Sequence, residues 1–105
     1  MAKYLVQGRY TVEGHKGLLK NGGSLRRQAT VKAMESVGGR VEAFYFAFGA
    51  DDFVIIVDAP DNVSAAAVAL DAAASGAVES RMTVLLTPEE VDQATKKSVA
   101  YRPPG

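Results

Sequence analysis

The chain has 105 residues, which is enough for one domain and too few for two. Its 12 basic and 12 acidic residues give a formal net charge of zero, which argues against nucleic-acid binding, because that needs a basic surface. It has no cysteine, which excludes disulfides and thiol chemistry, and no apolar run of the roughly 20 residues that span a bilayer. The start carries no signal-peptide pattern, so we expect a cytoplasmic protein with no nucleic-acid or membrane partner.

The first predicted element is a strand over residues 4–12. Its apolar side chains alternate with polar ones, which is the period of two that a half-buried strand shows. Four glycines follow, at Gly14, Gly17, Gly22 and Gly23. Because glycines punctuate regular structure, we interpret this stretch as an irregular connection.

A helix is predicted over residues 24–37. Ser24 is a suitable N-cap, and Gly38–Gly39 ends the helix because glycine accepts the left-handed cap conformation. Arg26 and Arg27 are expected on a solvated face. The apolar stripe recurs at four-residue steps and comprises Leu25, Ala29, Ala33 and Val37.

Two strands rich in aromatic and β-branched residues follow, over residues 40–48 and 52–58. Four residues or fewer would join them, so we expect an antiparallel hairpin with a tight turn. Neither strand alternates apolar with polar residues. In the first of the two, Phe44, Phe46 and Phe48 point one way, and the opposite set is also mostly apolar: Val41, Ala43, Tyr45 and Ala47.

The remaining sequence predicts a second helix over 63–75, a fourth strand over 77–87 and a short third helix to about residue 97. The third helix has a strong start signal, with a Thr cap residue, a following proline and a glutamate three residues after the Thr. We therefore expect a single domain over residues 1–97 and a tail over 98–105.

The order β-α-β-β-α-β, with an extra C-terminal helix, predicts an α+β fold of the ferredoxin-like type. In that sandwich two helices cover one face of a four-stranded antiparallel sheet. Because the central hairpin is apolar on both sides, the second face should be covered as well. The simplest cover is the same sheet of a second copy, so we expect a homodimeric α/β barrel.

The second predicted helix carries only one charged residue, Asp71, among many alanines. A surface helix usually has a polar face. One explanation is that the alanines are present because alanine is the best helix former. The other is that the helix is a second packing surface, which would give assembly beyond a dimer.

Residues 48–61, Phe-Gly-Ala-Asp-Asp-Phe-Val-Ile-Ile-Val-Asp-Ala-Pro-Asp, resemble the GYD-domain family. Gly49 and Asp52 match the family's turn, whereas Asp51 stands where a tyrosine is usual. The resemblance covers roughly residues 3–87 and implies a dimeric α/β-barrel, ferredoxin-like protein. It implies no particular activity. Further similar positions are Gly38–Gly39, Phe44–Tyr45 and Ser75–Gly76.

His15 is the only histidine and the candidate catalytic residue. It follows the first strand, where it could serve as an acid or a base. The alternative is a solvated loop histidine between Glu13 and Lys16. One histidine without cysteine gives no metal-ligand pattern, so we expect no metal and no cofactor.

The candidate ligand-binding residues are Arg9, Tyr10, Tyr45, Phe46 and Asp52. The tyrosines and Phe46 suit the lining of a small-molecule cavity, although core or interface packing would explain them too. Arg9, together with Arg81, could hold a ligand carboxylate or pair with acids at an interface. Asp51 and Asp52 point to opposite faces and cannot share a proton. We expect Asp52 to anchor the turn or to reach a neighbouring loop.

Three functions stay open at this point. The first is a small-molecule-binding or sensing module that acts as a homo-oligomer. The second is a cofactor-independent enzyme, of the monooxygenase, isomerase or decarboxylase type, acting on a small carbonyl or aromatic compound with His15 as its base. The third is a structural protein whose role is assembly.

Overall fold

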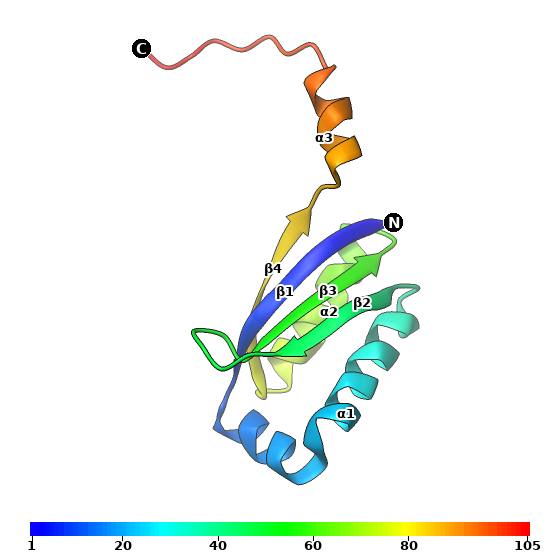
Figure 1. The fold of residues 1–105 in the computed structure, drawn as a ribbon, viewed down its shortest axis with the longest axis vertical. Helices are drawn as coiled ribbons and strands as arrows, with labels where there is room; N and C mark the ends of the chain where they lie inside the picture. The colour runs from blue at the N-terminus through cyan, green and yellow to red at the C-terminus, as the bar shows by residue number, and fades with distance from the viewer.

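The computed structural model describes residues 1–105 and confirms the ferredoxin-like α+β fold (Figure 1). Four strands and two helices make a compact body, and a third helix lies beyond it. The elements in chain order are β1 (Ala2–Tyr10), α1 (Val12–Ser36), β2 (Arg40–Phe46), β3 (Phe53–Ala59), α2 (Asn62–Ala74), β4 (Val78–Leu85) and α3 (Pro88–Thr95).

The four strands form one antiparallel sheet in the order β2-β3-β1-β4. β1 is therefore paired on both sides, with Leu5 opposite Ile56 of β3 and opposite Thr83 of β4. Both long helices lie on one side of the sheet, and the other side has no cover within the chain (Figure 1). The buried core lies between sheet and helices and comprises Tyr4, Tyr10, Met34, Phe53, Ile55, Val57, Ala59, Ala65 and Val78.

The prediction of an irregular connection after β1 is wrong, because α1 begins at Val12 and not at Ser24. Thr11 caps the helix, since its side chain accepts a hydrogen bond from the Gly14 N–H. The helix bends at Gly22, whose φ of 80° is a conformation that glycine adopts at no steric cost. The expected helix is thus the second half of a bent, 25-residue element.

The central hairpin also differs from the prediction in its details. β2 ends at Phe46, and six residues, 47–52, connect it to β3. Phe48 lies at the tip of this connection and is fully exposed. A register irregularity between Val41 and Ala43 brings Val41 opposite Val57, so Val41 packs against the core on the helix side with Phe44.

α3 has the predicted capping box, in which Thr87 and Glu90 bond to each other's backbone N–H groups. It projects away from the body, and residues 96–105 continue outward without regular structure (Figure 1). We call residues 86–105 the C-terminal arm. The domain boundary at residue 97 stays a prediction. None of the helices combines the length and hydropathy that crossing a membrane requires.

Two glycines in the first half of α1 offer a matched test of this helix. A Cβ at Gly14 would lie 2.1 Å from the carbonyl oxygen of Ala77, whereas a Cβ at Gly17 would meet nothing within 4 Å. Gly14→Ala should lower the free energy of unfolding by about 1–3 kcal/mol through overpacking. Gly17→Ala should raise it by about 0.5–1 kcal/mol, because alanine is the better helix former. Urea denaturation measures both, and equal effects would contradict the helical assignment.

Candidate functional site

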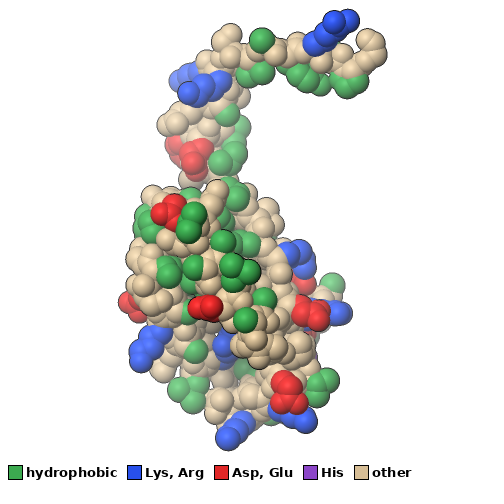
Figure 2. All heavy atoms as spheres, turned by 180° about the vertical axis from the view of Figure 1, so that it is seen from behind, with side chains coloured by type: hydrophobic (Ala, Val, Ile, Leu, Met, Phe, Trp, Pro, Cys, Tyr) green, Lys and Arg blue, Asp and Glu red, His purple; other side chains and the backbone are tan.

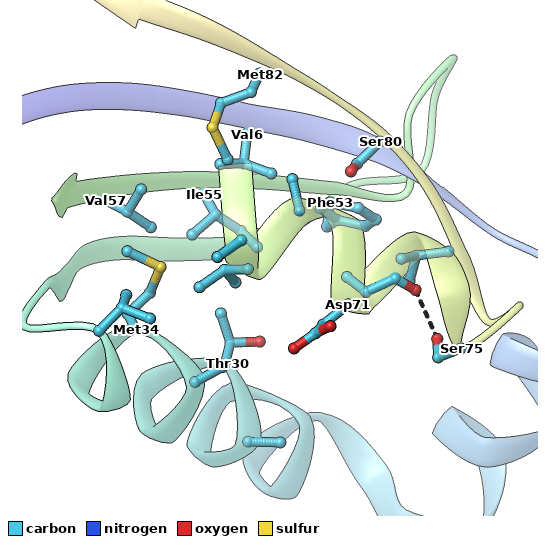
Figure 3. Close-up of a pocket in the computed structure, with 18 of the residues that line it drawn as sticks. Val6, Thr30, Met34, Phe53, Ile55, Val57, Asp71, Ser75, Ser80 and Met82 are labelled. Atoms are coloured by element: carbon cyan, nitrogen blue, oxygen red, sulfur yellow. Dashed lines mark hydrogen bonds between the residues drawn. The ribbon is translucent and has the colours of Figure 1, made fainter. Parts of the chain in front are cut away.

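A cavity of about 330 Å³ lies between α1, α2 and the helix side of the sheet (Figure 3). Its floor comes from the sheet, where Val6, Ile55 and Met82 face the helices. Its two walls are mostly small residues, and these leave room between the helices where larger side chains would close it. These small wall residues are Ala29, Thr30 and Ala33 of α1, Ala67, Ala69 and Ala72 of α2, and Ser75 at the C-cap of α2.

Two charged residues, Arg26 and Asp71, line this largely apolar cavity. The guanidinium carbon of Arg26 lies 5.9 Å from the centre of the Tyr10 ring, within range of a cation–π contact. Its Nε is buried without a hydrogen-bond partner, and no carboxylate of the chain forms an ion pair with it. The sequence predicted a solvated side chain here, so this residue was missed.

Tyr10 is the aromatic centre of the region, and only 8% of it is exposed. Its ring lies 5.1 Å from the Phe53 ring and 6.5 Å from the Phe46 ring, measured between centroids. Burial raises the pKa of the Tyr10 phenol above its ordinary value, and the Arg26 guanidinium opposes part of that rise. The neutral hydroxyl therefore persists at neutral pH, where it can donate a hydrogen bond.

His15 and Asp52 come together, although they were predicted for separate roles. The Nε2 atom of His15 lies 3.5 Å from Oδ2 of Asp52, and its Nδ1 lies 3.0 Å from the Thr11 carbonyl oxygen. Both ring nitrogens therefore face oxygen atoms that accept hydrogen bonds. About half of the His15 side chain is exposed, and it does not line the cavity.

Asp52 joins the hairpin connection to the end of β1. Its Oδ2 accepts a hydrogen bond of 2.9 Å from the Tyr10 N–H, and its own N–H donates to the Gly8 carbonyl at 2.7 Å. The side chain thus holds Tyr10 and His15 at the same corner of the molecule. Its observed contacts are those of an anchor between two segments.

The other predicted ligand residues lie elsewhere. Tyr45 is 71% exposed on the open side of the sheet, and Arg9 is exposed on β1. Phe46 is on the helix side, where its ring packs 5.1 Å from that of Phe44. The six predicted residues, His15 included, therefore do not converge on one cavity, and Tyr10 is the one among them that lines the space between the helices.

Near Arg9, Arg81 forms a two-bond pair with Asp51, at 3.0 and 2.9 Å. Hydrogen bonding to Arg81 lowers the pKa of Asp51 below its ordinary value. Asp51 therefore links the hairpin connection to β4, in addition to any effect on the local turn. An ion-pair set is one of the roles that the sequence predicts for Arg81. In the structure Arg81 pairs with Asp51 and also donates a hydrogen bond of 3.4 Å to Oε1 of Gln7.

The open side of the sheet combines an apolar centre with charged pairs at one end. Asp58 is buried, and its carboxylate lies 2.9 Å from the Lys3 ammonium and 3.0 Å from Nε of Arg40. The apolar centre is only half-buried in a single chain and comprises Leu5, Ala43, Val54 and Ile56. No group of three or more His, Asp or Glu side chains could hold a metal ion.

Comparisons with known proteins bear on family and fold. A family model described as "GYD domain" matches residues 4–95. Among solved structures, the crystal structure of MtbAldR is similar, with a TM-score of 0.60 and 23% sequence identity. That match covers 82% of this chain and 52% of the other, so the chain spans about half the length of the MtbAldR chain. Curated proteins give no significant match.

The adjacent aspartates of the hairpin connection should differ in their effect on stability. Asp52→Ala leaves the partly buried Tyr10 N–H without its acceptor and should lower the free energy of unfolding by roughly 1–3 kcal/mol. Asp51→Ala removes an exposed ion pair and should change it little. Urea denaturation of both variants tests this, and a larger loss in Asp51→Ala would refute the anchoring role of Asp52.

Proposed function

The chain belongs to the GYD-domain family, and from that premise we propose that it is a small-molecule-binding or sensing module that works as a homo-oligomer. The observation that carries the proposal is the cavity of about 330 Å³ between α1, α2 and the sheet. Its volume lies at the lower end of the range for ligand pockets, which are mostly apolar with a few polar groups. Tyr10 and Arg26 supply such groups here.

A second copy of the chain is the proposed cover for the open side of the sheet. Leu5, Val54 and Ile56 form an apolar centre that the chain itself leaves half-exposed. Tyr45 adds a large amphipathic side chain, which is a residue type enriched at protein interfaces. The same patch on both partners makes a two-fold contact self-complementary.

A cofactor-independent enzyme is the second candidate. His15 beside Asp52 favours it, because a histidine and a carboxylate 3.5 Å apart are a pair of titratable groups that acid–base catalysis can use. Because His15 does not line the cavity, we rank binding without chemistry first. Turnover of an aromatic or keto acid that disappears in His15→Ala would reverse this order.

Assembly as the main role is the third candidate, and it depends on the outer side of α2. Figure 2 views the molecule from the helix side, where apolar side chains gather over the body. Val63 and Leu70 of α2 are largely exposed there. A large oligomer with no ligand response across a broad panel would favour this role.

Filling the cavity tests the binding proposal. Ala33→Leu places three more carbon atoms between the helices, and Ala72→Leu does so from the opposite wall. Each should abolish the thermal shift caused by small aromatic and keto acids and their neutral counterparts. Each should also raise the free energy of unfolding by about 1–2 kcal/mol, because apolar carbon is buried.

Ala66→Leu is the matched control, since Ala66 is an exposed residue of α2 that does not line the cavity. It should leave ligand responses unchanged. Ligand binding that survives both filling variants would refute the cavity as the binding site.

Charge substitution tests the assembly. Ile56→Lys places a charge at the centre of the open side of the sheet, where burial in an interface would be costly. Sedimentation equilibrium should show a dimer for the unmodified chain and a monomer for Ile56→Lys. Val63→Lys, on the outer side of α2, should stay dimeric. The reverse pattern would place the interface on α2.

A further inference from the structure

We infer that the cavity between α1 and α2 binds a small apolar monocarboxylate, whose carboxylate group pairs with Arg26 while its body lies among the alanines. The inference rests on the proposed binding function and adds the chemical class of the ligand. Neither the sequence motifs nor the family match points to Arg26.

The first argument is the missing counter-charge. Nε of Arg26 is buried without a partner, whereas Arg40 and Arg81 both pair with aspartates. Burying a polar N–H group is costly unless a hydrogen-bonding or charged group compensates. The Tyr10 ring face offers a cation–π contact, which leaves the Nε–H donor without an acceptor. A ligand carboxylate would accept hydrogen bonds from two guanidinium N–H groups at once.

The second argument is the balance of charges around the cavity. Arg26 is the one basic residue that lines it, so a single negative charge can be matched and the two charges of a phosphate monoester cannot. Asp71 is the one acidic residue, and it is exposed on α2 (Figure 3). Its charge disfavours an anion, so the carboxylate should be drawn to Arg26 and the Tyr10 hydroxyl instead.

The third argument is the position of Arg26 between two hollows. A second hollow, of about 420 Å³, lies inside the bend of α1, and Tyr10, Arg26 and Ala29 line both. Arg26 therefore lies between the two hollows. A molecule whose apolar body lies among the alanines of the cavity can reach Arg26 with one charged end.

The test uses the full chain and two acids, phenylacetate and 4-methylpentanoate, each paired with its neutral amide. Isothermal titration should show each acid binding on the order of tenfold or more tightly than its amide, since a charge-assisted pair is lost in the amide. In Arg26→Gln the acid preference should disappear while amide binding persists. Arg26→Lys should retain part of the preference, because lysine keeps the positive charge but lacks the planar guanidinium that can bind a carboxylate through two N–H groups.

Arg27→Gln is the matched control, since it removes an exposed arginine from the adjacent position of α1 and should leave both affinities unchanged. Asp71→Asn should tighten acid binding by removing the one negative charge at the cavity. Circular dichroism checks that each variant is folded.

The outcomes separate the two proposals. Amides that bind as tightly as acids, or an acid preference that survives Arg26→Gln, would overturn the role of Arg26 and leave the cavity as a binding site. Absence of binding by all four probes would overturn the binding function together with this inference.

Discussion

The double pairing of β1 is the constraint from which the rest of the structure follows. β1 pairs with β3 and with β4, and neither is its neighbour in sequence. Each connection must therefore cross over the sheet, and both crossovers place their helix on the same side. One side of the sheet is buried as a result, and the other has no cover within the chain. β1 and β4 also approach each other so closely that position 8 requires a glycine. A Cβ on Gly8 would lie 2.1 Å from the Glu79 carbonyl oxygen.

Much of this fold could be predicted because local pattern and tertiary environment agree. The alternation in β1, the glycine stop at Gly38 and the capping signals of α3 are local features, and the structure confirms them. The first half of α1 could not be predicted in the same way. Glycine is a poor helix former, but Gly14 is suited to a helix that passes close to Ala77. That contact is between residues far apart in sequence, so no local pattern reveals it.

The site was only partly predictable, for a related reason. Tyr10 could be chosen because its place in an alternating strand determines which side it faces. Arg26 could not, because Arg26 and Arg27 look equivalent in sequence, and only the bend at Gly22 and the position of Tyr10 make one of them half-buried. The contact of His15 with Asp52 depends on the same unpredicted first turn of α1.

The C-terminal arm affects how large the molecule looks in solution. The radius of gyration of the chain is 16.5 Å, whereas compact domains of 100 residues have about 13 Å. By the same scaling, 16.5 Å is the value for a compact protein of roughly 200 residues. A single extended chain thus has the apparent size of two compact ones. Gel filtration would therefore give a monomer the apparent size of a dimer, and molar mass is the quantity that identifies the state.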